Sequence, residues 1–316
     1  MAKKSGKARS KRKPVRPAKK PALATKTSVK QAPASPSPLP NVWQLTKMTA
    51  LTLWDNKQLF VGLTLVYGLL SLVLVQGLGS TTDITSLKHN LNQAFTGHLG
   101  SVASSLSVFA VLVDSAGNSS SPTAGVYQLV LGLIASLAVI WALRQRLAGH
   151  QLRVRDAYYK GMYPLIPFIL VLIVIGLQLI PLLVGSSIYA IVTTNAIAVH
   201  LAEKLVFIIL FGLLAGWTLY MLSSSLFALY IVTLPDMTPL KALRSARELV
   251  RHRRWTVLRK ILWLPVALLL IAAIIMLPII LWLTPLAQWL FFILTMFVLV
   301  AIHGYMYTLY RELLND

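Results

Sequence analysis

Long apolar runs without a charged residue constrain this chain more than any other feature of its sequence. No residue is charged between Gln58 and Thr82, and the same holds from Ile261 to Met276. A helix of about 20 apolar residues, rising about 1.5 Å per residue, is long enough to cross a bilayer. Hydrophobic residues make up 56% of the chain and charged residues only 12%, about half the usual charged share. The sequence therefore predicts an integral membrane protein.

The number of such runs predicts an all-α fold, a polytopic membrane bundle of about six transmembrane helices. The expected spans are 58–80, 126–145, 163–184, 205–234, 258–283 and 288–310, within a membrane domain over 41–316. Two further apolar pieces, 102–113 and 185–200, are short or polar for a crossing. We expect these two pieces to form helices on the outer surface, or to pack among the spans.

Lysine and arginine are distributed unequally among the segments that connect the predicted spans. Of the 30 lysines and arginines, only Lys88 and Lys204 would lie on the outer side of a six-span bundle. Cytoplasmic loops of membrane proteins carry the excess of these residues. The distribution therefore predicts a protein of the cell's inner (plasma) membrane with cytoplasmic N and C termini, and one added span would break this segregation.

Residues 1–40 form a basic segment that is rich in lysine, alanine, proline and serine. Charge repulsion and the lack of large apolar residues predict a disordered cytoplasmic tail. Its cations can contact anionic lipid headgroups, or can bind nucleic acid nonspecifically through phosphates. No aromatic residue is interleaved with these cations for base stacking. The composition therefore favours a solvated or lipid-contacting tail over a nucleic-acid partner.

A basic amphipathic segment, 238–255, stands directly before the fifth predicted span. Thr238 as cap and Pro239 in the first turn are common signals for the start of a helix. Such a helix can lie along a membrane, with its cations at lipid phosphates and its leucines in the acyl boundary. Its expected apolar face comprises Leu240, Leu243, Ala246 and Val250. The expected headgroup contacts are Lys241, Arg244, Arg247, Arg251, Arg253 and Arg254, with Arg153 and Arg155 from a second basic segment.

Three amphipathic segments, 41–54, 152–162 and 238–255, each precede a pair of predicted spans. In the second segment Ala157 is followed four positions later by Gly161, and in the third Ala246 follows Ala242 at the same spacing. This pattern predicts three helical hairpins, each preceded by a cytoplasmic amphipathic helix. The alternative is that loops between spans are generally basic and amphipathic, without any repeat.

The run from Met237 to Trp255, followed by a span, resembles the membrane domain attached to some bacterial glycerophosphoryl diester phosphodiesterases and its stand-alone multi-span relatives. The matching positions are Ala242, Leu243, Ser245, Leu249 and Trp255. The resemblance covers residues 40–312. It implies a six-span membrane module without hydrolase activity, because the phosphodiesterase itself belongs to a separate soluble barrel.

Groups that carry chemistry are sparse in the predicted spans. All nine acidic residues fall in loops, surface helices or the C-terminal tail, which argues against an ion-coupled or proton-coupled carrier. The chain has no cysteine, and its six histidines show no metal-ligand spacing. We therefore expect no enzymatic activity, no cofactor and no metal site.

A few polar or small residues inside spans admit two readings. His303 is either a proton-relay group or a neutral histidine bonded to a backbone carbonyl or to Tyr307, and we favour the second. The serines at 223–225 are expected to pack helices or to bond to the preceding turn. Gly212 and Gly216, four residues apart, predict close helix packing within the chain or in a dimer.

Two functions of different classes fit these observations. The first is a non-enzymatic membrane protein that organises the membrane or assembles with other proteins. Its partners would be anionic lipids, together with a second copy or another membrane protein. The second is a passive transporter or channel for a lipid or small solute. Its cavity would be lined by Tyr220, Ser223, Ser224, Ser225 and His303. A membrane-tethered nucleic-acid binder is a third, weaker alternative.

Overall fold

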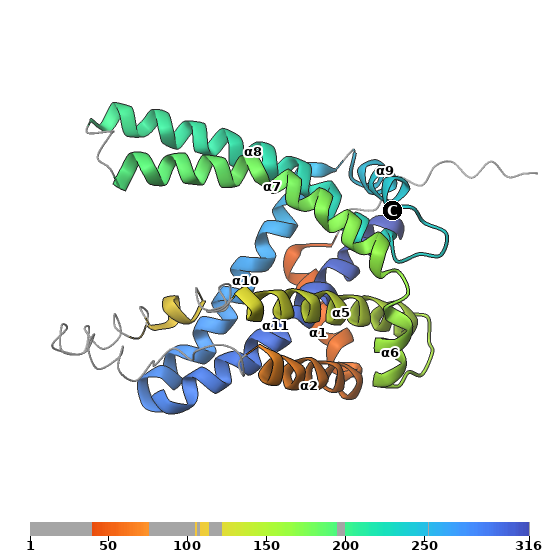
Figure 1. The fold of residues 1–316 in the computed structure, drawn as a ribbon. Coiled ribbons are helices and arrows are strands. Elements are labelled where there is room, and N and C mark those ends of the chain that lie inside the picture. The colour runs from red at the N-terminus through yellow and green to blue at the C-terminus, as the bar shows by residue number, and fades with distance from the viewer. Residues whose placement is uncertain are drawn as a thin grey trace, which may run out of the picture. The chain divides into compact units, whose positions relative to one another are not determined.

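A computed structural model of the protein describes residues 40–75, 105, 108–113, 122–194, 200–251 and 253–315. All of them belong to one compact unit, Pro38–Asp316. This described part is helical and contains no strand (Figure 1). The predicted disordered tail over 1–40 lies, except for Pro40, outside the described residues.

Six helices of the described part are long and apolar enough to cross a membrane, as predicted. They are α2 (Lys57–Leu74), α5 (Pro122–Leu147), α7 (Leu165–Thr194), α8 (Leu201–Ile231), α10 (Arg254–Trp282) and α11 (Thr284–Asn315). Three shorter helices are α1 (Val42–Asp55), α6 (Val154–Gly161) and α9 (Pro239–Val250). Among the long helices, α2 packs against α5, α7 against α8, and α10 against α11.

The third long helix continues beyond its predicted end. We expected a span to residue 184 and a separate piece over 185–200, whereas α7 runs unbroken to Thr194. The hydroxyls of Ser186 and Ser187 donate to the carbonyl of Leu183 at 2.9 and 2.8 Å, so the helix itself satisfies these polar groups. Tyr189 stacks on Phe211 of α8, with ring centroids 6.1 Å apart. The extension therefore packs on the neighbouring helix, and residues 195–199 lie outside the described residues.

The predicted helix over 102–113 is described at residues 105 and 108–113, which are helical. Its buried side chains pack with residues of α10 and α11, and the Phe109 ring meets Phe291 edge to face at 6.4 Å. Of the two placements expected for this piece, the described residues fit packing among the long helices. This cluster comprises Val108, Phe109, Leu112, Ala272, Met276, Ile280 and Ala287.

The short helix α6 approaches α5 very closely. A Cβ atom built on Gly161, the last residue of α6, would lie 3.0 Å from the Cα of Ala138 and 3.1 Å from the carbonyl oxygen of Leu137. The hydroxyl of Tyr158 donates to the carbonyl oxygen of Leu63 on α2 at 2.8 Å, and burial raises the pKa of Tyr158. Helix α6 is thus fixed to two long helices, at α5 by backbone proximity and at α2 by a hydrogen bond.

Helix α1 packs against α11, although the two stand at opposite ends of the described sequence. It begins after its N-cap Asn41, whose backbone N–H donates to the Gln44 side chain at 3.2 Å. A Cβ atom built on Gly304 of α11 would lie 3.2 Å from the Thr49 methyl group and 3.3 Å from the Leu53 side chain. The absence of a side chain at Gly304 therefore lets α1 approach α11 closely.

Candidate functional site

Helix α9 starts as its sequence predicts. Pro239 is its first residue, and the Thr238 hydroxyl accepts a hydrogen bond from the backbone N–H of Lys241 at 3.4 Å. In the turn that joins α8 to α9, Asp236 has a φ of 61°, in the left-handed region. Aspartate tolerates that region better than most residues, since its short polar side chain can bond locally. The turn and the cap together set the direction in which α9 leaves α8.

The apolar face of α9 is covered by other helices of the chain. Ala242, Ala246 and Val250 are 0% exposed, and α9 packs against α8, α7 and α11. The prediction that Leu240 shares this face is wrong, because its side chain is 72% exposed. Ala242, Ala246 and Val250 recur at intervals of four residues and so share one face of the helix, and Leu240, two residues before Ala242, lies outside it.

The predicted headgroup cations of α9 lie on its uncovered side. Lys241, Arg244, Arg247 and Arg251 are all exposed. Arg253 and Arg254 follow at the start of α10 and are partly buried. The Arg254 guanidinium lies over the Tyr220 ring, 4.6 Å from its centroid. Tyr220, an expected cavity residue, thus contacts a cation at the helix surface instead.

Helix α6 has the same arrangement on a smaller scale. Ala157 is fully buried and Gly161 is buried, while Arg153 and Arg155 are exposed. The small residues that the sequence comparison paired in α6 and α9 are therefore buried in both helices. In each helix this leaves basic side chains on the opposite, uncovered side.

Two arginines at the end of α5 bind within the protein. An Arg144 N–H donates to the carbonyl oxygen of Thr233, just after α8, at 2.9 Å. The Nε of Arg146 donates to the side-chain oxygen of Asn56, between α1 and α2. These two cations connect three parts of the fold, so we assign them a structural role.

His303 belongs to a cluster of aromatic side chains between α8 and α11. Its Nδ1 lies 3.0 Å from the hydroxyl of Tyr230. The expected partner, Tyr307 or a backbone carbonyl, is therefore replaced by a tyrosine of another helix. Tyr230 also contacts the rings of Tyr307 and Tyr310, each with centroids 6.2 Å from its own.

The serines of α8 bond to the preceding turn, as predicted. The Ser223 hydroxyl donates to the Tyr220 carbonyl at 2.8 Å, and Ser224 and Ser225 donate to the Met221 carbonyl at 3.0 and 3.3 Å. All three serines are buried. We expected these serines to line a transport cavity together with Tyr220 and His303. The hydrogen bonds and ring contacts of these five residues are instead made within α8 or between helices.

Gly212 and Gly216 do not pack against another helix of the described part. Both residues are exposed, and a Cβ atom built on either meets no atom within 4 Å. Packing of this pair within the chain, one of the two predicted alternatives, is therefore wrong for the described residues. The helix face that carries them points outward, so contact with a second copy stays a prediction.

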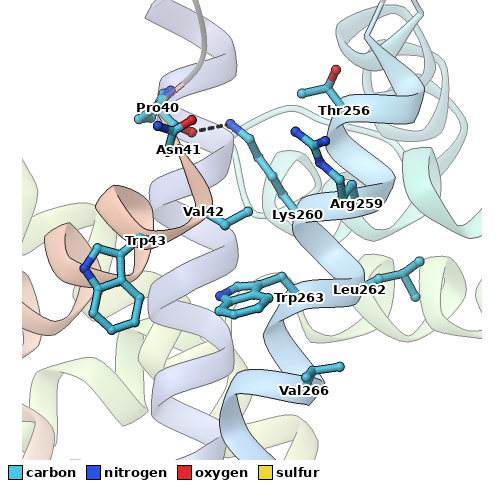
Figure 2. A pocket seen from close by; sticks show the side chains of 10 residues that line it. All are labelled: Pro40, Asn41, Val42, Trp43, Thr256, Arg259, Lys260, Leu262, Trp263 and Val266. Atoms are coloured by element: carbon cyan, nitrogen blue, oxygen red, sulfur yellow. Dashed lines mark hydrogen bonds between the residues drawn. The ribbon is translucent and has the colours of Figure 1, made fainter.

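A pocket of about 490 Å³ lies between the start of α1 and the start of α10. We call it the α1–α10 pocket (Figure 2). The part of the lining that comes from α10 includes the cations Arg259 and Lys260 and the indole ring of Trp263. None of the lining residues is acidic. The lining residues are Pro40, Asn41, Val42, Trp43, Thr256, Arg259, Lys260, Leu262, Trp263 and Val266.

Lys260, at the edge of this pocket, is a buried cation that the sequence analysis overlooked. It is 2% exposed, and its Nζ donates to the carbonyl oxygen of Pro40 at 2.6 Å. The Tyr305 hydroxyl of α11 donates to the Lys260 carbonyl oxygen at 3.0 Å. Lysines commonly flank a membrane span, so the sequence carries no signal that separates Lys260 from the cations before it.

Replacing Tyr305 by phenylalanine is expected to destabilise the protein by about 1 kcal/mol, because it removes the hydrogen bond to the Lys260 carbonyl. Thermal unfolding of the purified variant measures this loss. Tyr310→Phe, which removes a hydroxyl from the same helix, is the matched control. Equal unfolding temperatures for Tyr305→Phe and the wild type would contradict the assigned role of this bond.

No family model, curated protein or solved structure matches the chain. The resemblance to the membrane domain of glycerophosphoryl diester phosphodiesterases therefore rests on the residues over 237–255 alone. Within the described ranges, no group of three histidines or carboxylates could hold a metal ion. The six long apolar helices indicate the class of multi-pass helical membrane proteins.

Proposed function

We propose that this chain is a non-enzymatic, multi-pass protein of the plasma (inner) membrane that organises the membrane or assembles with other membrane proteins. In this proposal the three hairpins α2–α5, α7–α8 and α10–α11 span the bilayer, and α1, α6 and α9 lie at its cytoplasmic face. The N and C termini are then cytoplasmic. The partners are anionic lipids, with a second copy or another membrane protein as a further partner.

The observation that carries the proposal is the two-sided character of α9. Its small apolar side is buried against α8, while Lys241, Arg244, Arg247 and Arg251 point away from the protein. Helix α9, which carries most of them, ends at Val250, and α10, which is long enough to span, begins at Arg254. If α10 crosses the bilayer, these cations lie at the level of the headgroups. A cation near an anionic leaflet contributes about 1 kcal/mol of attraction.

The protein contact of α9 changes how this attraction would act. A free amphipathic helix binds a membrane through its own apolar face. In α9 that face is already occupied by other helices, so the helix does not need to insert. The cations would instead act together as a fixed charged surface, held at one depth by the adjoining long helices. Such a surface would gather anionic lipids around the protein.

Replacing the six cations Lys241, Arg244, Arg247, Arg251, Arg253 and Arg254 by glutamine is expected to remove most of the stabilisation by anionic lipid. The wild-type protein should unfold at a higher temperature in nanodiscs of phosphatidylglycerol than in nanodiscs of phosphatidylcholine. This difference in unfolding temperature should be much smaller for the six-fold variant. If the wild type shows no preference between the two lipids, or if the variant keeps it, the headgroup role of α9 is wrong.

A passive transporter or channel is the alternative that the sequence raised. Its five expected lining residues make contacts at the helix surface, within α8, or between α8 and α11. None of the five lines the α1–α10 pocket. Since no specific observation in the described part favours a solute path, we retain the non-enzymatic proposal.

A further inference from the structure

The α1–α10 pocket has a cationic end and an apolar end. Figure 2 shows the Lys260 ammonium and the Arg259 guanidinium at one end, with Trp263 and Val266 further along α10. Arg259 and Val266 are seven residues apart, which corresponds to about 10 Å along a helix at about 1.5 Å per residue. A molecule that fills this pocket would therefore meet positive charge at one end and apolar side chains about two turns away.

The charge at the cationic end is held in place by the protein. Lys260 is 2% exposed and bonded to the Pro40 carbonyl, so its ammonium is fixed beside the start of α1. Arg259 is exposed, and its planar guanidinium can bind two phosphate oxygens at once. Asn41 and Thr256 add polar groups to the lining, and none of the lining residues carries a carboxylate. These features suit a phosphate group.

The apolar end opens toward the surroundings of α10. Leu262 is 42% exposed and Val266 is 49% exposed, and both belong to a helix long enough to span a membrane. Trp263 and Trp43 add indole rings, which favour the boundary between headgroups and hydrocarbon. A water-soluble anion would use only the cationic end. An occupant that uses both ends carries an anionic group and a hydrocarbon chain.

From this gradient we infer that the α1–α10 pocket binds one anionic phospholipid, with its phosphate at Arg259 and Lys260 and an acyl chain along Trp263 and Val266. The inference rests on the proposed function in one respect, since it requires α10 to cross the bilayer. It goes beyond that function, because the α9 cations would attract many lipids loosely, whereas the pocket holds one. Its volume of about 490 Å³ is within the usual range of small-molecule sites, about 300–1,000 Å³.

The test uses the purified full-length chain and native mass spectrometry with dioleoyl phosphatidylglycerol and dioleoyl phosphatidylcholine. The wild type should retain one phosphatidylglycerol per chain in preference to phosphatidylcholine. Arg259→Gln should weaken this binding about tenfold, equivalent to about 1.4 kcal/mol. Arg259 is exposed, so its loss should leave folding intact. Lys260→Gln is a second variant, scored only if its unfolding temperature stays close to that of the wild type.

Arg311→Gln is the matched control, because it removes an exposed cation from α11, outside the pocket. It should leave the single bound lipid unchanged. Equal losses for Arg311→Gln and Arg259→Gln would show only general attraction to the protein surface and would overturn the pocket. Unchanged binding in Arg259→Gln would overturn it as well.

Two further probes distinguish a lipid from a simple anion. Inorganic phosphate and a short-chain phosphatidylglycerol should both compete poorly with the dioleoyl lipid, because neither fills the apolar end. Displacement by inorganic phosphate as effective as displacement by the lipid would reduce the site to an anion site and overturn the inference. The nanodisc measurement compares proteins that differ only in the six α9 cations and all retain Arg259, so failure of the pocket and failure of the proposed function can be told apart.

Discussion

A cysteine in place of Lys204 is expected to react with a membrane-impermeant maleimide added to intact cells, and a cysteine in place of Arg247 is expected not to react. The wild-type chain contains no cysteine, so each variant has a single reactive thiol. Both positions are exposed. Position 204 lies near the start of α8, and position 247 lies in α9, which follows the end of α8. If α8 spans the membrane, the two thiols lie on opposite sides. The labelled fraction of each purified protein is measured after the treatment. Labelling should be nearly complete at position 204 and nearly absent at position 247.

The control is the same labelling after the cells are permeabilised, when both cysteines should react. A reactive cysteine at position 247 in intact cells would place α9 outside the cytoplasm. Reaction at both positions before permeabilisation would mean that α8 does not separate two compartments. Either outcome would also remove the basis for placing the α9 cations at the cytoplasmic leaflet.

Replacing Gly161 by leucine is expected to have the largest effect on stability of any single substitution described here. Even its first side-chain atom would lie 3.0 Å from the Cα of Ala138, and that neighbour is helix backbone that cannot move aside cheaply. Overpacking of this kind costs about 1–3 kcal/mol. The leucine should push α6 away from α5. The measurements are a lower unfolding temperature and faster proteolysis near residues 148–162.

Gly176→Leu is the matched control for this substitution. Gly176 lies in α7, is exposed, and a Cβ atom built there meets no atom within 4 Å. The same change of residue should therefore leave the unfolding temperature nearly unchanged. If Gly161→Leu and Gly176→Leu are equally stable, α6 does not pack on α5 as the structure shows.

The long helices could be predicted from sequence because their signal is local. An uncharged apolar run of sufficient length specifies a spanning helix without reference to the rest of the chain. The end of α7 could not be predicted in this way. Residues 185–194 are less apolar, but Tyr189 packs on Phe211, which is near in space and distant in sequence. Contacts of this kind decide where a helix ends, and a hydropathy pattern does not contain them.

For the site residues as well, local patterns could be predicted from the sequence and contacts between helices could not. The exposure of Lys241, Arg244, Arg247 and Arg251 follows from the periodicity of α9, and the sequence predicted it. The partner of His303 depends on how α8 meets α11, so the sequence predicted the wrong tyrosine. Gly212 and Gly216 have a spacing that suits helix contact, but spacing does not show whether a partner helix is present.

The α1–α10 pocket was missed because its parts are far apart in the sequence. Pro40 and Lys260 are 220 positions apart and are joined by one hydrogen bond. In sequence, Arg259 and Lys260 look like the last members of a basic run that precedes a span. Only the packing of α1 against α11 brings the start of α1 to this part of α10.

The contact between α1 and α11 affects how the protein folds while the ribosome is still synthesising it. Helices α6 and α9 each emerge shortly after α5 and α8, the helices on which they chiefly pack, so most of their docking surfaces already exist. Among the described helices, α1 is synthesised before all the others and α11 after them, so α1 lacks this partner until α11 is made. Until then the methyl group of Thr49 lacks its contact at Gly304. A nascent chain that stops before α11 can insert its earlier helices without the contact that brings the start of α1 to the α1–α10 pocket.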